Sequence, residues 1–164
     1  MIISLMAILS FFLAPKRGIV AKQWEQQQLQ QTILEENLLK EFYHLGEKSG
    51  NGVNGYTLEQ LIDERHFPPR PLKVGLNRLQ RKGMMKYDQG RWQFTEAGQA
   101  KGKRVVKLHR LWELYLSTYL RIAPDHVHED AETIEHIITP ELEAELEKLL
   151  DYPEVDPHQS KIPY

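Results

Sequence analysis

Residues 57–83 read TLEQLIDERHFPPRPLKVGLNRLQRKG, and this stretch decides the fold. Thr57 can cap a helix over residues 58–65, whose apolar side chains share one face. The prolines that follow end that helix, and a second helix over residues 70–82 can hold proline only in its first turn. Gly83 ends the second helix. Its buried face consists of leucines at three- and four-residue steps, Leu72, Leu76 and Leu79. The stretch has the proportions of a helix-turn-helix.

The second helix projects basic and amide side chains away from its leucines. Arg, Lys and Asn on such a helix can contact base edges and phosphates in a major groove of DNA. Residues 84–95 alternate in polarity across a turn at residues 88–90, which predicts a β-hairpin, or wing. The residues that we expect to contact DNA are Arg70, Lys73, Asn77, Arg78, Arg81 and, at the tip of the wing, Arg91.

The charge of the chain is unevenly distributed. The net charge is −2, yet residues 70–110 hold twelve Lys and Arg against two acidic residues, a local charge of +10 that leaves −12 elsewhere. This uneven charge predicts a polyanion partner for the middle of the chain and a metal or protein partner for the acidic C-terminal part. The alternative is a winged helix that contacts protein, but the basic segment favours nucleic acid.

Composition narrows the chemistry further. The chain has 164 residues, enough for one globular unit or two small ones. It contains no cysteine. Disulfide frameworks, thiolate zinc sites and cysteine nucleophiles are therefore excluded, and the composition fits a reducing compartment.

Six imidazole and carboxylate side chains fall at helical spacing in the C-terminal half. Residues three and four apart share one face of a helix, so such side chains can converge. Nitrogen and oxygen donors of this kind suit Mn²⁺, Fe²⁺ or Zn²⁺. The alternative is a solvated helix face with ordinary charge pairs. The six candidate ligands are His109, Glu113, His128, Glu132, Glu135 and His136.

The remaining patterns are mostly helical. Helices are expected over residues 21–47, 95–121, 128–138 and 140–150, with a glycine-rich loop at 49–55 and an extended tail at 151–164. The fold class is therefore mainly α, with one small β-hairpin. We expect three parts: an apolar segment (1–20), a connecting helix with the winged helix (21–100), and a helical domain for metal binding and dimerisation (101–164).

Residues 2–14 form an unbroken, mostly apolar run that is followed by Lys16 and Arg17. As a helix the run would reach about 20 Å, short of the roughly 30 Å hydrocarbon core of a bilayer. Basic residues after the run are typical of the cytoplasmic end of a membrane span. A weak N-terminal anchor and a start codon inside a longer membrane protein are the alternatives, and we favour the second.

Four segments resemble the metal-dependent transcriptional repressors typified by the diphtheria toxin repressor and the manganese transport regulator. They are LKEFYHLGEKSG, GKRVVKLHRLWELYL, HVHEDAETIEH and PHQSKIP. The resemblance spans most of the chain and implies a winged helix-turn-helix followed by a helical metal-binding and dimerisation domain. It implies an activating divalent metal, Mn²⁺ or Fe²⁺ with Zn²⁺ as an alternative, a homodimer, and a double-stranded DNA operator.

The same resemblance assigns roles to the candidate ligands. His109, Glu113 and His128 match an ancillary metal site, and Glu132, Glu135 and His136 match the primary one.

The family's N-terminal helix supplies one or two further primary ligands, and Asn37 and Lys40 stand at those positions here. The Asn37 amide oxygen can bind metal, whereas a protonated Lys40 cannot. Glu35, Glu36 and Glu41 are nearby carboxylates that could substitute.

The segment SLMAILSFFLAPKRGIVAK resembles the last membrane helix of metal-uptake ABC transporter permeases, some of which carry a repressor-like domain behind them. The sequence therefore supports two functions. The first is a cytoplasmic, metal-responsive repressor of Mn and Fe homeostasis. The second is a metal-sensing regulatory tail of a permease, attached to the inner face of the bacterial plasma membrane. An enzyme is not expected, because no HExxH motif or paired ExxH motif is present.

Overall fold

The computed structural model describes residues 19–50, 55–65, 68–123, 136 and 138–164. The chain divides into two compact units, Met1–Leu34 and Glu35–Tyr164. No helix within the described ranges has the length and apolarity that crossing a bilayer requires. The predicted membrane-span end at residues 2–14 lies outside those ranges.

Helix α2 (Ile19–Ser49) begins in the first unit and ends in the second, which confirms the helix predicted over residues 21–47. In the first unit its apolar side chains Trp24 and Leu29 are exposed. Within the second unit the helix buries one apolar face, made of Leu38, Leu39, Phe42 and Leu45. The Phe42 ring contacts Phe94 and Tyr56, with ring centroids 5.7 Å apart in each pair.

The helix-turn-helix is formed by α3 (Leu58–Arg65) and α4 (Pro69–Arg81). A capping box starts α3, because the Gln60 N–H donates to Thr57 Oγ1 at 3.2 Å and the Thr57 N–H donates to Gln60 Oε1 at 2.9 Å. Helix α4 holds prolines in its first turn. The three leucines predicted for its buried face, Leu72, Leu76 and Leu79, are each 0% exposed.

The wing consists of β1 (Met85–Asp88) and β2 (Arg91–Phe94), paired antiparallel. Gln89 and Gly90 connect them with φ angles of 47° and 79°, as a two-residue type I′ turn requires. Trp92 is 6% exposed and forms an additional β-bridge with Tyr56.

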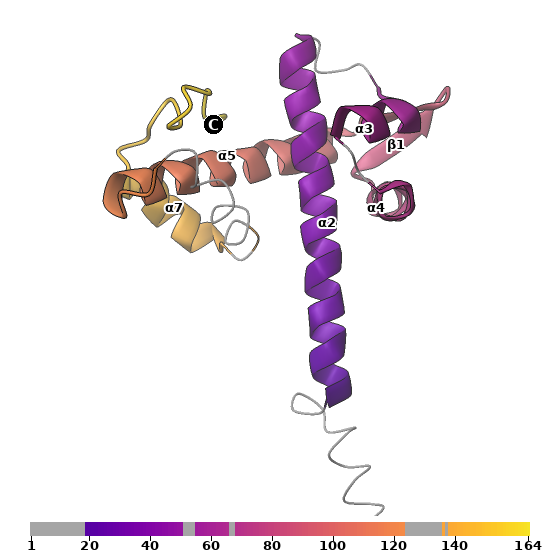
Figure 1. Ribbon diagram of the computed structural model, residues 1–164, viewed down its shortest axis with the longest axis horizontal. Coiled ribbons are helices and arrows are strands. Elements are labelled where there is room, and N and C mark those ends of the chain that lie inside the picture. Colours follow the sequence, from indigo (N-terminus) through magenta and orange to yellow (C-terminus); the bar gives the residue numbers. More distant parts are fainter. Residues whose placement is uncertain (1–18, 51–54, 66–67, 124–135, 137) are drawn as a thin grey trace, which may run out of the picture. The chain divides into compact units, whose positions relative to one another are not determined.

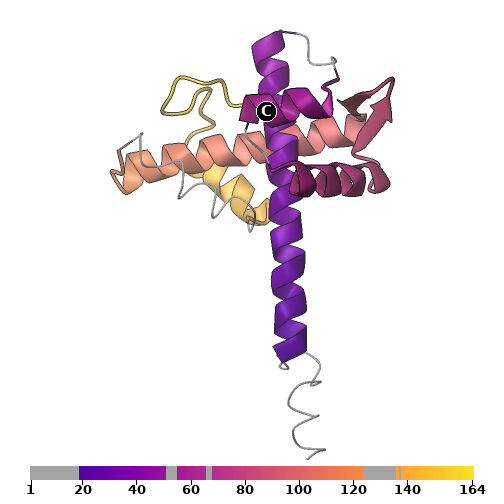
Figure 2. The same cartoon turned by 45° about the vertical axis from the view of Figure 1, so that its right-hand side comes forward.

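Helix α5 (Glu96–Tyr119) starts at Thr95, whose hydroxyl accepts from the Gly98 N–H. Figures 1 and 2 show the wing at the N-terminal end of α5, with α7 (Pro140–Leu149) and the C-terminal tail at its other end. A cluster of buried side chains joins α5, α7 and the tail, namely Leu111, Leu146 and Ile162.

Arg110 of α5 is a buried charged residue that contacts both α2 and the C-terminal tail. Its guanidinium is buried and donates to both carboxylate oxygens of Glu47 on α2, at 3.0 and 2.7 Å. It also donates to the Lys161 carbonyl at 2.5 Å and lies 3.6 Å from the Asp156 carboxylate. Burial acts to raise the pKa of Glu47, but the Arg110 hydrogen bonds and charge outweigh burial and lower it. Arg110 therefore ties α5 to α2 and to the tail.

The mainly α fold with a winged helix-turn-helix is confirmed. Helix α5 ends at Tyr119, two residues before the predicted end at Arg121, which has a positive φ of 57°. The helix expected over residues 128–138 falls almost entirely outside the described residues, and the three-part division of the chain stays a prediction.

At Gly98, helix α5 lies close to the backbone of Met84, which precedes the wing. A Cβ at this position would lie 1.8 Å from the Met84 carbonyl oxygen, a contact that requires the backbone to move. We expect Gly98→Ala to lower the free energy of unfolding by about 1–3 kcal/mol, the range for overpacked sites. Urea titration followed by circular dichroism measures this.

The matched control is Gly102→Ala on the same helix. A Cβ there would lie 3.1 Å from the Leu39 carbonyl oxygen, so a small shift accommodates it. Alanine also favours the helix by about 1 kcal/mol over glycine. The cost at Gly102 should therefore be much smaller than at Gly98, and equal costs would contradict this account of the close approach.

Candidate metal centre and basic face

His136, a candidate primary ligand, lies against helix α2. Its Nδ1 is 2.6 Å from Glu36 Oε2, although the two residues are 100 positions apart in the chain. The side chain of His136 is 1% exposed and that of Glu36 is 11% exposed. An ionised carboxylate can only accept, so the Nδ1–H of the imidazole donates.

The second oxygen of Glu36 is also engaged. Lys101 of α5 places its Nζ 2.5 Å from Glu36 Oε1. Burial desolvates the Glu36 carboxyl and acts to raise its pKa, but the hydrogen bonds from His136 and Lys101 and their positive charges outweigh burial. The pKa of Glu36 is therefore lowered, and the group is ionised at neutral pH.

Asn37, the next residue on α2, has an unsatisfied oxygen. Its Oδ1 is buried and has no hydrogen-bond partner among the described residues. Buried amide oxygens are almost always paired, and an amide oxygen is a ligand for hard divalent cations. Asn37 therefore fits the position of a metal ligand. Lys40, one turn later, is 2% exposed.

His109 and Glu113, candidate ancillary ligands, are brought together on α5. His109 Nε2 lies 3.2 Å from Glu113 Oε1, and the two side chains are 4% and 3% exposed. A solvated helix face does not describe this pair, because a buried imidazole and carboxylate lose their hydration and need compensating contacts.

The other three candidate ligands, His128, Glu132 and Glu135, lie outside the described residues. Within the ranges that are described, no three His, Asp or Glu side chains are grouped so that they could hold a metal ion. The ligand sets assigned from the sequence therefore stay predictions.

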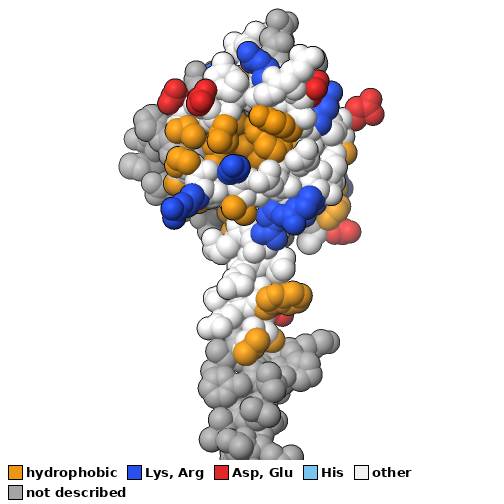
Figure 3. Space-filling view, turned by 90° about the vertical axis from the view of Figure 1, so that its right-hand side faces the viewer, with side chains coloured by type: hydrophobic (Ala, Val, Ile, Leu, Met, Phe, Trp, Pro, Cys, Tyr) orange, Lys and Arg blue, Asp and Glu red, His pale blue; other side chains and the backbone are white. Residues whose placement is uncertain are grey.

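Helix α4 exposes most of the side chains predicted to contact DNA. On the face that carries this helix and the wing, Lys and Arg side chains flank an apolar area, and Asp and Glu side chains lie along its upper edge (Figure 3). The exposed candidates are Arg70, Lys73, Asn77, Arg81 and, in the wing, Arg91. Arg91 also donates to the Gly55 carbonyl at 2.8 Å, so its guanidinium is partly used within the fold.

Arg78 differs from the other candidates because it is half-buried against α2. Its Nε is 3.5 Å from the Glu35 carboxylate, which Lys82 contacts at 2.5 Å. Glu35 and Glu36, which the sequence suggested only as substitute ligands, thus contact different neighbours. The sequence did not predict the contact of Lys101 with Glu36, because the two residues are far apart in the chain and no local spacing links them.

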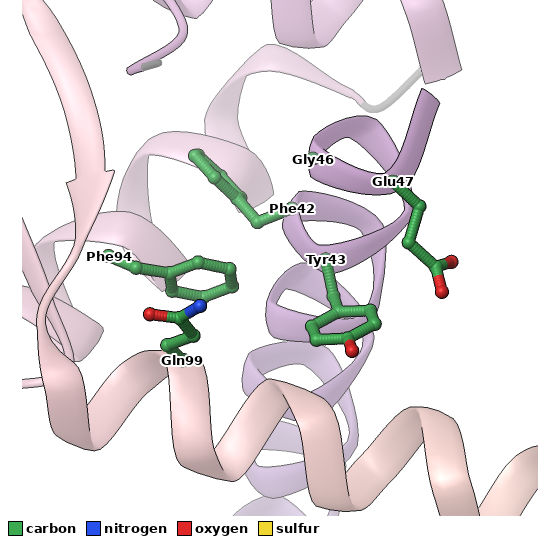
Figure 4. Close-up of a pocket in the computed structure, with 6 residues that line it drawn as sticks. All are labelled: Phe42, Tyr43, Gly46, Glu47, Phe94 and Gln99. Carbon is green, nitrogen blue, oxygen red and sulfur yellow. The ribbon is translucent and has the colours of Figure 1, made fainter. Parts of the chain in front are cut away.

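A separate pocket lies between α2, β2 and α5 (Figure 4). Half of its lining residues are aromatic, and Glu47 is the one charged residue among them. None of the residues predicted to bind metal or DNA lines it. The residues that line it are Phe42, Tyr43, Gly46, Glu47, Phe94 and Gln99.

Comparison with known proteins finds a family match for the C-terminal region. Residues 95–164 match the family described as iron dependent repressor, metal binding and dimerisation domain. The structure is similar to that of the manganese regulator SloR, with a TM-score of 0.69 and 27% identity over 79% of this chain and 59% of that one.

Curated relatives include membrane proteins of metal transport. A probable metal transport system membrane protein of Chlamydia trachomatis is 33% identical over 79% of this chain and 29% of its own length. The manganese transport system membrane protein MntC of Bacillus subtilis is 31% identical over 73% of this chain and 27% of its own length. The chain thus spans less than a third of either relative.

The unsatisfied Asn37 oxygen carries a stability prediction. With a chelator present, we expect Asn37→Leu to raise the free energy of unfolding by about 1 kcal/mol, because it removes a buried polar atom that lacks a partner. Thermal unfolding in chelator measures this. The control is Asn77→Leu on the exposed face of α4, which should give no gain. A loss of stability at Asn37 would show that its amide is satisfied.

Proposed function

From the match of residues 95–164 to the iron dependent repressor metal binding and dimerisation domain, we propose that the chain is a metal-responsive, DNA-binding transcriptional repressor of divalent metal homeostasis. One observation carries the proposal. Neighbouring carboxylates of α2 contact the basic helix α4, through Glu35, and the candidate ligand His136, through Glu36. A single helix is thus in contact with both the predicted DNA-reading element and the predicted metal site.

The donor set indicates the metal. Nitrogen and oxygen donors without thiolate suit Mn²⁺ or Fe²⁺, with Zn²⁺ as the alternative. We assign Glu132, Glu135 and His136 to the primary site, with the Asn37 oxygen as the contribution of α2. We assign His109, Glu113 and His128 to the ancillary site. When bound, the metal supplies a positive charge on which these side chains converge.

The proposed mechanism is a linkage between metal and DNA. Metal that binds better to the DNA-competent arrangement shifts the population toward it, and DNA must then tighten metal binding by the same factor. A two-fold dimer would present two α4 helices to successive major grooves of a palindromic operator. SloR, named as a manganese regulator, supports this proposal because it shares the fold.

A second candidate function is a metal-sensing cytoplasmic tail of a metal permease. The observation that favours it is the identity of 31–33% to metal transport membrane proteins. Both functions place residues 35–164 in the cytoplasm. They differ in whether the domain binds an operator, or instead regulates a transporter at the inner face of the membrane.

Fluorescence anisotropy separates the two functions. Labelled promoter DNA from the chain's genomic neighbourhood is titrated with the full chain in Mn²⁺ and then in chelator. A repressor should bind DNA more tightly in Mn²⁺, typically 5–150-fold for allosteric coupling, and chelator should reverse the gain. Glu135→Ala should abolish the gain. No binding of DNA in either condition would refute the repressor and favour the permease tail.

Lys73 tests the assignment of α4 as the DNA-contacting helix. Its side chain is exposed, so Lys73→Ala should weaken DNA binding without changing the fold. Loss of one phosphate contact should reduce the slope of log K against log salt by about 1. The matched control is Lys148→Ala, which removes one exposed lysine from α7. Equal changes in DNA affinity and in salt dependence for the two substitutions would contradict the assignment of α4 as the DNA-contacting helix.

A further inference from the structure

We propose that Glu36, anchored by Lys101, is the positioning residue for His136: it accepts the Nδ1–H, selects that ring tautomer, and so directs Nε2 to the metal. The inference rests on the proposed function, because it assumes that His136 binds metal. It goes further by assigning a role to two residues, Glu36 and Lys101, that belong to neither ligand set.

The contact geometry restrains the carboxylate from both sides. Glu36 Oε2 is 2.6 Å from His136 Nδ1, and Oε1 is 2.5 Å from Lys101 Nζ. A carboxylate with each oxygen held by a different element cannot rotate without breaking one contact. Burial strengthens the contact with His136 most, because the side chains of Glu36 and His136 are only 11% and 1% exposed, whereas that of Lys101 is 29% exposed.

An imidazole needs such a partner in order to act as a metal ligand. Histidines that bind metals through one ring nitrogen usually donate the N–H of the other to a carboxylate or carbonyl. That hydrogen bond decides which nitrogen carries the proton and makes the ligating nitrogen more basic. Glu36 uses Nδ1, and Nε2 is then the nitrogen with a lone pair for the metal.

Direct ligation by Glu36 is the competing role for this carboxylate. A metal bound to either Glu36 oxygen would lie beside a donor that already contacts that oxygen, Lys101 at Oε1 or His136 at Oε2, and would compete with that charge-assisted contact. The positioning role keeps both contacts. The positioning role also connects the metal site to α2 through the contact of His136 with Glu36. This connection does not need a ligand at position 40, where a protonated lysine cannot bind metal.

The test combines a tautomer measurement with metal affinity on the full chain. In chelator, nitrogen-15 NMR of labelled histidines, with His136 assigned by its loss in His136→Gln, should show the Nδ1–H tautomer for His136. Glu36→Gln should shift His136 away from that tautomer.

In competition with a fluorescent chelator, the same variant should bind Mn²⁺ 10–100-fold more weakly. The visible spectrum of bound Co²⁺ should keep its shape, because the ligands are unchanged.

Glu35→Gln is the matched control. It removes the same charge from the adjacent position of α2, where the carboxylate contacts Arg78 and Lys82 instead of His136. It should leave both the tautomer and the Mn²⁺ affinity as in the wild type. Lys101→Met provides a second variant that leaves Glu36 in place, and it should change the tautomer and the affinity in the same direction as Glu36→Gln.

The outcomes separate this inference from the proposed function. A wild-type chain that binds no Mn²⁺ would overturn both. Mn²⁺ binding by the wild type that is unchanged in Glu36→Gln and Lys101→Met would overturn the inference alone. A changed Co²⁺ spectrum in Glu36→Gln would make Glu36 a ligand rather than a positioning residue. An equal loss of Mn²⁺ affinity in Glu35→Gln would show that the loss in Glu36→Gln comes from the removed charge and not from the contact with His136.

Discussion

The fold of residues 35–164 depends on one buried guanidinium. Arg110 is buried, and a guanidinium carries five N–H donors, so its burial requires partners that satisfy these groups. These partners come from α2, through both oxygens of Glu47, and from the C-terminal tail, through Asp156 and the Lys161 carbonyl. Because the N–H groups of Arg110 are shared between these two segments, the same buried charge stabilises the packing of both α2 and the tail against α5.

The second feature that links the parts of the unit is the pair of carboxylates on α2. Consecutive residues of an α-helix point about 100° apart, so neighbours in sequence can face different elements. Glu35 faces Arg78 and Lys82 on the basic side, while Glu36 faces His136 and Lys101. Helix α2 is therefore in contact with the candidate ligand His136 through Glu36 and with Arg78 of α4 through Glu35.

Only part of the positive charge of the basic segment (residues 70–110) is available to a polyanion. Much of the +10 is neutralised inside the fold, since Arg104 and Lys107 contact Glu143 at 2.7 and 2.6 Å and Lys107 also contacts Glu147. Arg110, Lys101 and Lys82 likewise have carboxylate partners. Burial acts to lower the pKa of Lys107, but its hydrogen bonds to Glu143 and Glu147 raise it overall. The charge left for a polyanion is concentrated on α4 and the wing.

The sequence by itself determined the elements whose signals are local. The capping box at Thr57 and Gln60, the leucine spacing of α4 and the turn at Gln89 and Gly90 each act within a few residues, so pattern alone predicted them. Tertiary structure alone decided which charges are paired, because residues 36, 101 and 136 belong to separate segments that no periodicity connects. It also showed that the Asn37 oxygen is buried without a described partner. Burial and long-range pairing depend on how helices pack, and a linear pattern contains neither.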